Sequence, residues 1–192
     1  MTLKEAVSDL DSNVREFAAE LDGQRFPAND RSRIGAALLD QSHEHARAIA
    51  LLLSQKIYGA AFSLLRGQFE TAIRAFWLLR CASEEQLTRF QDDRVDLTAS
   101  EIITEVEKAL GEQDTVLSQI KSKSWKALSS FVHGGFQQAV RRITSESISP
   151  DYNEEELIAL ARFSRFCFLL AAVETCYVIE NEALAIEWAH RL

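Results

Sequence analysis

The chain has 192 residues, enough for one domain with a full hydrophobic core, and its 47% hydrophobic and 26% charged residues are typical of a folded globular protein. The formal net charge of −8 argues against sequence-independent binding of DNA or RNA and against attraction to an anionic membrane, because both depend on clustered Lys and Arg. With only 2 Pro and 7 Gly to interrupt it, the chain favours long helices, and we predict a single all-α domain over residues 1–192.

The cysteines and the apolar runs indicate a cellular compartment. Three cysteines is an odd number, and all three lie in apolar stretches, which argues against a disulfide framework and fits a reducing cytosol. The N-terminal segment MTLKEAVSDL lacks the apolar region of a signal peptide. The longest apolar run, near residues 166–179, contains Glu174 and falls short of the roughly 20 apolar residues of a spanning helix. We therefore expect a cytoplasmic protein that does not span a membrane.

Two helices are predicted in the first quarter of the chain. Residues 2–21 carry apolar side chains at spacings of three and four, which predicts an amphipathic helix that Gly23 ends. Asp30 is expected to cap a second helix that runs to about Leu53. The connection over residues 55–59 is short, so the second helix and the one that follows are expected to be antiparallel neighbours.

The segment Ile57–Cys81 is apolar on almost every side. A helix with this pattern lies inside a bundle rather than on its surface, so we expect the rest of the chain to pack around it. Ser63, Gly67 and Thr71 form a narrow stripe of small residues where a neighbouring helix can approach closely. Because Gly67 costs a helix about 1 kcal/mol relative to Ala, close packing is a sensible reason for its presence.

Residues 82–124 are more polar, and we expect them to form an excursion with short helices. Thr98 and Glu101 are spaced as a capping box that opens a helix, and Gly111 is placed to end it. Asp114 is expected to cap another short helix.

The last third of the chain predicts two longer helices. Residues 121–124 are expected to form a solvated hinge, followed by a helix over residues 125–143 with a kink at the glycine pair 134–135. Its buried side is expected to contain Trp125, Leu128, Val132, Phe136, Ala139 and Val140. A final helix runs from a cap at Asn153 to about Ala189. The chain as a whole therefore predicts a bundle of five or more helices with an up-and-down core.

Charged residues interrupt the apolar central helix at one stripe. Arg66, Glu70 and Arg74 lie four residues apart, with apolar residues on both sides of the stripe, and Glu70 precedes Arg74 in the favoured order for an intrahelical ion pair. The stripe is either a solvated edge or a structural ion pair that sets helix register, or it is one wall of a functional pocket.

A second set of polar residues follows on the helix predicted after residue 125. Lys126, Ser129 and His133 line one edge of that helix, next to its apolar side. An imidazole in such a place needs a hydrogen-bond partner, which Glu70 or Ser129 can supply. We therefore take Arg66, Glu70 and His133 as candidate catalytic residues, and Arg74, Lys126 and Ser129 as candidate binding residues.

Two short patterns at these positions carry a resemblance. The central helix reads L-L-R-G-x-F-E-x-A-I-R and the later helix reads L-S-S-F-V-H-G-G. Together they look like a group of uncharacterised bacterial helical-bundle proteins, which are similar to the HEPN superfamily of RNA-cleaving toxins and phage-defence proteins. The resemblance covers about residues 57–136 and implies a HEPN-like helical fold, with Arg66 and Glu70 on one helix of the site and Ser129 and His133 on the other.

One departure from that superfamily bears on function. Active HEPN nucleases carry an Arg four to six residues before the His, whereas the stretch KALSSFV before His133 offers Lys126 and no Arg. Arg66 or Arg74 would have to replace that cation in space. We therefore expect a binding or regulatory protein, in a toxin–antitoxin or phage-defence setting. The alternative is a metal-independent ribonuclease in which His133 moves a proton and Arg66 steadies the phosphate.

Other chemistries find little support in the sequence. The patterns Asp-x-x-His at 40–43 and Glu-x-x-His at 187–190, with Glu70 and Glu174, could complete a ferritin-like di-metal site. However, Asp replaces the usual Glu in the first pair, and the second pair lies next to the C-terminus. No nucleophile elbow and no Gly-rich phosphate loop is present. We expect no metal and no cofactor.

The number of large apolar residues in the chain indicates a protein partner. Five aromatic residues are more than we expect one small bundle to cover: Trp77, Phe163, Phe166, Phe168 and Trp188. On this basis we expect a homodimer, and a separate partner protein is a further possibility.

Overall fold

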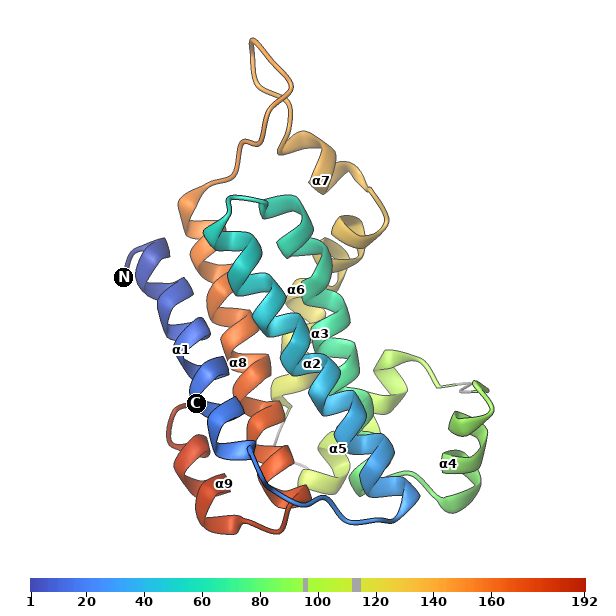
Figure 1. Ribbon diagram of the computed structural model, residues 1–192. Helices are drawn as coiled ribbons and strands as arrows, with labels where there is room; N and C mark the ends of the chain where they lie inside the picture. The colour runs from blue at the N-terminus through green and yellow to red at the C-terminus, as the bar shows by residue number, and fades with distance from the viewer. Residues whose placement is uncertain (95–96, 112–114) are drawn as a thin grey trace.

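The computed structural model describes residues 1–94, 97–111 and 115–192, and this part of the chain is all-helical (Figure 1). It contains nine helices and no strand, which confirms the all-α prediction. The helices are α1 (Leu3–Leu21), α2 (Asp30–Ser54), α3 (Tyr58–Arg80), α4 (Glu84–Gln91), α5 (Ala99–Leu110), α6 (Val116–Val132), α7 (Phe136–Val140), α8 (Glu154–Val178) and α9 (Glu182–Ala189). The predicted cap at Asp114 lies outside the described residues.

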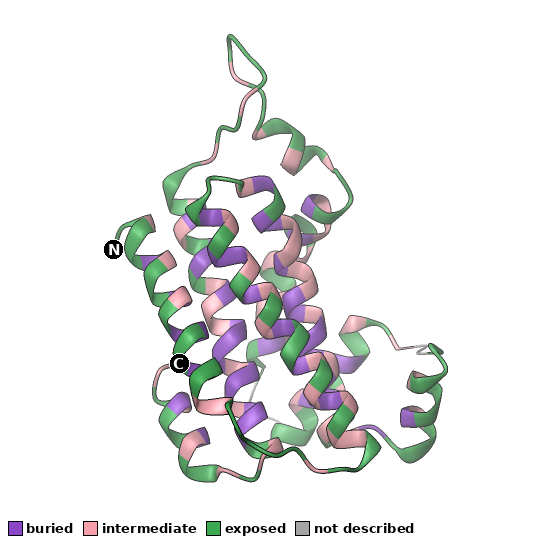
Figure 2. Cartoon of the chain, in the orientation of Figure 1, coloured by how far each residue is buried: buried purple, intermediate pink, exposed green. Residues whose placement is uncertain are grey.

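Helix α3 lies at the centre of the bundle, as its sequence predicts. It packs against α2, α5, α6 and α8, while α1 covers α2 and α8 from the other side. Figure 2 shows buried residues along most of its length. Its largest fully buried side chains are Trp77, Phe69, Ile73 and Leu78. Gly67 faces α2, because a Cβ at this position would lie 3.2 Å from Cε1 of His45.

A buried polar network joins the three central helices. Ser42 of α2 donates a hydrogen bond to the carbonyl of Gln68 at 3.1 Å. The Gln68 side chain donates to the carbonyl of Ser164 on α8 at 2.9 Å, and the Ser164 hydroxyl donates back to Oε1 of Gln68 at 2.8 Å. Each of these groups is fully buried and hydrogen-bonded, so the network sets the register of α2, α3 and α8 without leaving a polar atom unpaired.

Helix ends with a local signal lie where the sequence predicts them, with one correction. The capping box of Thr98 and Glu101 opens α5, and Gly111 ends it with φ +120°. Asp30 was expected to cap the second helix, but Asn29 is the N-cap and its side chain accepts a hydrogen bond from the backbone N–H of Ser32. Asp30 is instead the first helical residue, where its charge favours the positive end of the helix dipole.

The predicted hinge and the long helix after it are wrong. Residues 121–124 lie inside the continuous helix α6, which ends at Val132. Gly134 follows with φ +63°, a left-handed conformation that stops the helix, and α7 begins as a separate short helix. Because α7 turns away from the bundle, Phe136 is 73% exposed instead of buried. Val132 and Val140, also expected to be buried, are exposed as well.

The final helix is also broken into two. Helix α8 ends at Val178, Glu180 adopts φ +59°, and the Asn181 side chain then caps α9 by accepting from the backbone N–H of Leu184. The reversal folds α9 back against the bundle, so that the Trp188 ring packs 5.0 Å from the ring of Phe17. An unbroken helix would have carried Trp188 away from this core.

The aromatic residues on which we based the expected dimer lie mainly inside the chain. Trp77, Phe168 and Trp188 are buried, and Phe163 and Phe166 are partly buried against the core. The bundle therefore covers most of the aromatic surface on which the expected homodimer was based. No helix in the described part of the chain is long and apolar enough to cross a membrane.

Candidate functional site

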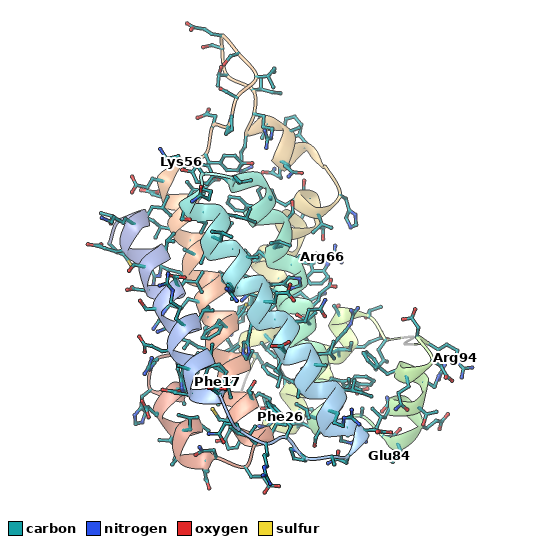
Figure 3. The ribbon with its side chains drawn as sticks, in the orientation of Figure 1. Phe17, Phe26, Lys56, Arg66, Glu84 and Arg94 are labelled. Atoms are coloured by element: carbon teal, nitrogen blue, oxygen red, sulfur yellow. The ribbon has the colours of Figure 1, made fainter. Side chains whose placement is uncertain are left out.

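Arg66 is the centre of a polar cluster between α3 and α6 (Figure 3 labels Arg66). Its Nε donates to Oε1 of Glu70 at 2.7 Å, and its Nη1 donates to the hydroxyl of Ser129 at 3.1 Å. The same Nη1 lies 3.3 Å from Nε2 of His133. The guanidinium carbon lies 4.5 Å from the ring centroid of Trp125. These five residues are called the Arg66 cluster below.

Helical periodicity explains why these residues meet. Arg66 and Glu70 are one turn apart on α3, on the side that faces α6. Trp125, Ser129 and His133 follow one another at four-residue spacing along α6, so they form a row on one helix face. The structure therefore brings together residues from two segments about sixty positions apart in the chain.

Hydrogen bonds from Ser63 and Gln138 set the position of α6 and α7 along α3. The hydroxyl of Ser63 on α3 donates to the carbonyl of Phe131 on α6 at 3.1 Å, and Gln138 on α7 donates to the hydroxyl of Ser63 at 3.3 Å. His133 is the C-cap of α6, and its backbone N–H donates to the carbonyl of Ser129. The imidazole is therefore attached to a helix end that α3 holds in place.

The charges of the cluster are partly removed from water. The side chain of Arg66 is 22% exposed and that of Glu70 is 20% exposed. Arg74 approaches the same carboxylate only to 4.0 Å and is 42% exposed. In this environment the Arg66–Glu70 pair is less screened than a surface pair, so Arg66 is held in one orientation while Arg74 remains a peripheral cation.

The contact with Arg66 restricts the hydrogen bonding of His133. A guanidinium group can only donate, so a hydrogen bond across this contact requires Nε2 of His133 as the acceptor and the ring proton on Nδ1. Nη1 of Arg66 has two hydrogens, which match its two acceptors, Ser129 and His133. Because the His133 side chain is exposed, its imidazole is open to a ligand on the solvent side.

Lys126 lies outside the cluster, on the rim of a neighbouring groove. The groove runs between α5 and α6, has a volume of about 610 Å³, and also includes Trp125 and Ser129 in its wall. These two residues belong to the Arg66 cluster as well, so the groove and the cluster are continuous. Of the predicted site residues, Arg66, Glu70, Ser129 and His133 meet directly. Arg74 and Lys126 lie at the edge.

The residues of the considered di-metal site do not converge. Glu70 is bound by Arg66, and Glu174 accepts bidentate hydrogen bonds from Arg80 at 2.6–3.0 Å. Among the described residues, no group of three or more His, Cys, Asp or Glu side chains is arranged to hold a metal ion. Glu70 instead forms an ion pair within α3, and Glu174 of α8 forms one with Arg80 of α3.

Trp125 is the residue of the candidate site that our sequence interpretation misplaced. It was expected in the core, but its ring is partly exposed and lies beside two cations, Arg66 at 4.5 Å and Lys121 at 5.1 Å. The signal that could have found it is the four-residue spacing from Lys121 through Trp125 and Ser129 to His133. That spacing places all four residues on one face of a helix.

The fold and the cluster define an all-helical protein with an arginine-centred polar site between two helices. The chain belongs to the family described as Family of unknown function (DUF6988), which matches residues 39–191. The matched part contains the whole Arg66 cluster and the groove beside it. No curated protein and no solved structure matched the chain.

Proposed function

We propose that this protein is a cytosolic binding or regulatory protein whose Arg66 cluster recognises an anionic group of its ligand. The observation that carries the proposal is the fixed guanidinium: Nε and Nη1 of Arg66 are held by Glu70, Ser129 and His133, while Nη2 has no partner among the described residues. A cation held by its neighbours loses little conformational entropy when an anion binds, which favours recognition.

The setting of this function is also a proposal. The resemblance to HEPN proteins supports a bacterial protein encoded in a toxin–antitoxin or phage-defence locus. In such a setting a binding or regulatory protein acts through its ligand or a partner protein rather than through chemistry of its own.

Thermal unfolding in the presence of small anions tests the proposal. Sodium phosphate, sodium sulfate and sodium acetate are compared with sodium chloride at matched ionic strength. We expect phosphate to raise the unfolding midpoint by about 2–4 °C for each kcal/mol of binding free energy. Arg66→Gln should abolish the shift, and Arg66→Lys should reduce it because a lysine cannot reproduce the planar donor geometry.

Arg74→Gln is the matched control, since it removes the same charge from the same helix at the edge of the cluster. It should keep most of the shift. The same midpoint in all salts for the wild type, or an equal shift in wild type and Arg66→Gln, would contradict the proposal.

A metal-independent ribonuclease is the second candidate. The observation that favours it is the 3.3 Å separation of Arg66 Nη1 and His133 Nε2, which would place a phosphate-binding cation beside a group that can accept a proton. For catalysis the imidazole would exchange its hydrogen bond from Arg66 for one from the substrate hydroxyl. Incubation with structured RNA and EDTA, comparing wild type with His133→Ala, tests this function. Equal cleavage, or none, in both proteins removes it.

A further inference from the structure

The charges of this acidic chain are strongly segregated along the sequence. Residues 115–145 contain Lys121, Lys123, Lys126, Arg141 and Arg142 and no Asp or Glu, although the whole chain has a formal net charge of −8. This stretch forms α6, α7 and the turns beside them. Arg141 is paired with Glu156, so the unpaired positive charge of this stretch rests mainly on the lysines of α6.

The α5–α6 groove opens on this basic stretch. Two lysines, Lys121 and Lys126, lie along it, and no carboxylate is among the described residues that line it. The remaining polar lining is mostly hydroxyl groups: Ser100, Thr104, Ser118, Ser122 and Ser129. Four of these hydroxyls already donate to protein acceptors: Thr104, Ser118, Ser122 and Ser129. The two ammonium groups are therefore the main donors that the groove offers to an oxyanion ligand.

The acidic residues of α5 already accept hydrogen bonds within the protein, one of them from Ser118 in the groove wall. Glu101 accepts from the backbone N–H of Thr98 in the capping box, and Glu107 accepts from the backbone N–H of Ser118 at 2.7 Å and from its hydroxyl at 2.5 Å. Glu105 accepts from the indole N–H of Trp77 at 2.5 Å. The carboxylates that could neutralise the groove are therefore committed to structural roles.

The aromatic wall of the groove is already in contact with cations. The Lys121 ammonium lies 5.1 Å from the Trp125 ring centroid and also donates to the hydroxyl of Ser100. The Arg66 guanidinium lies 4.5 Å from the same ring. Cation–π contacts hold both positive groups at the Trp125 ring, and they leave the indole poorly suited to stack on a base. Recognition in the groove therefore depends on charge rather than on a base.

We infer that the α5–α6 groove binds the phosphate groups of a small phosphorylated ligand and selects it by phosphate number, not by base. This inference rests on the proposed role of the Arg66 cluster and names the class of ligand for that site. The volume of the α5–α6 groove, about 610 Å³, falls in the range of sites for molecules of nucleotide size. Lys121 and Lys126 take the phosphates, with Arg66 at the end that adjoins Ser129.

Isothermal titration calorimetry of the full chain with four probes tests the ligand class. Pyrophosphate, ATP and GTP should all bind, ATP and GTP with affinities within roughly threefold of each other, and adenosine should not bind. The affinity for pyrophosphate should fall as sodium chloride is raised, because salt screens the ammonium groups. Equal affinity for adenosine and ATP, or a large preference for one base, would overturn the inference.

Three substitutions on the same helix locate the site. Lys121→Gln and Lys126→Gln should each weaken pyrophosphate binding about tenfold, the effect of losing one charge-assisted hydrogen bond. Lys123→Gln is the matched control, since Lys123 is exposed on α6 and does not line the groove. It should leave the affinity within about twofold of wild type. An equal loss in all three variants would show non-specific attraction to the basic stretch and would reject the groove.

Two further comparisons complete the test. One distinguishes a small phosphorylated ligand from RNA, and the other distinguishes the groove from the Arg66 cluster as the anion site. A single-stranded RNA oligonucleotide that binds while pyrophosphate and nucleotides do not would contradict a small ligand. Pyrophosphate binding that is lost in Arg66→Gln but kept in both lysine variants would reject the groove and leave the Arg66 cluster as the anion site. Binding lost in the lysine variants and kept in Arg66→Gln would reject the role proposed for the cluster.

Discussion

Arg66 and Arg74 illustrate how two identical side chains on one helix acquire different roles. Both lie one turn from Glu70, but only Arg66 also meets residues of a second helix, Ser129 and His133. Arg74 has the longer contact, 4.0 Å, and more exposure. A side chain held by partners from two helices is positioned for recognition, whereas one with a single long ionic contact at the surface mainly adjusts the local charge.

His43 is a half-buried titratable residue of α2 that the candidate site does not use. Its ring packs 5.1 Å from the ring of Phe17 and 5.0 Å from that of Phe168, and its Nε2 is buried without a hydrogen-bond partner among the described residues. This burial lowers the pKa of His43 from 6.5 to about 3, because no group near the ring compensates for loss of hydration of the charged form.

We predict that His43 makes the fold acid-sensitive. Between pH 6.5 and about 3 the unfolded chain binds a proton that the folded chain excludes, so the free energy of unfolding falls as the pH is lowered. The slope is about 1.4 kcal/mol per pH unit, or about 2 kcal/mol between pH 6.5 and 5. Urea unfolding at pH 7 and pH 5 should show this extra loss in wild type and not in His43→Leu.

The control is His190→Gln, which removes an exposed histidine near the C-terminus. This variant should keep the wild-type dependence on pH. An identical loss of stability in wild type and His43→Leu would mean that the ring of His43 is protonated in the folded protein.

At the scale of helices, the close approach of α2 and α3 depends on Gly35. A Cβ at this position would lie 2.6 Å from Cγ and Cδ2 of Leu79, which is too close for ordinary van der Waals contact. Replacing glycine by alanine within a helix normally stabilises it by about 1 kcal/mol. We predict the opposite sign here, a loss of about 1–3 kcal/mol for Gly35→Ala, because one of the helices or the leucine must move.

Urea denaturation of single and double variants measures this contact. In a Leu79→Ala background, Gly35→Ala should no longer destabilise the protein, because the clashing side chain has been removed. Gln41→Ala, at an exposed position of the same helix, should change stability by less than about 0.5 kcal/mol. If Gly35→Ala stabilises the wild type, α2 and α3 are farther apart than the structure places them.

Helix ends set by neighbouring residues could be predicted from the sequence, and those set by tertiary packing could not. The capping box of Thr98 and Glu101 and the stop at Gly111 depend on residues within one turn of the helix end, so the local pattern was enough. The breaks after Val132 and Val178 depend on tertiary packing, which turns α7 away from the bundle and brings α9 back to it. An apolar periodic pattern continues across both breaks, and periodicity alone therefore predicted single long helices.

For the molecule as a whole, the candidate site was partly predictable. The four-residue spacing of polar residues on two apolar helices indicated that Arg66, Glu70, Ser129 and His133 could meet if the helices were neighbours. The groove could not be predicted, because it needs the relative position of α5 and α6 and the hydrogen bonds that occupy the carboxylates of α5. The net charge of −8 averages over the whole chain, so it does not show that Lys121 and Lys126 lie together at this groove.

One end of the molecule exposes apolar side chains that nothing in the described chain covers. Helix α7 and the loop after it extend beyond the end of the bundle (Figure 1). Exposed fractions there are 73% for Phe136, 55% for Ile143 and 78% for Ile148. Grouped exposed apolar residues of this kind are typical of protein–protein contacts, and they replace the buried aromatic residues as the basis for expecting a homodimer.

We predict that a second copy of the chain covers this end. Size-exclusion chromatography with light scattering should give twice the mass of the chain at micromolar concentration, and Phe136→Ser with Ile148→Ser should give the mass of one chain. Ile186→Ser is the matched control, because Ile186 is 50% exposed on α9, at the opposite end of the bundle. It should leave the dimer intact.

A wild-type protein that stays monomeric at high micromolar concentration contradicts the prediction. In that case the apolar end faces a different partner or remains in water, at a cost in solubility that the same two serine substitutions would relieve.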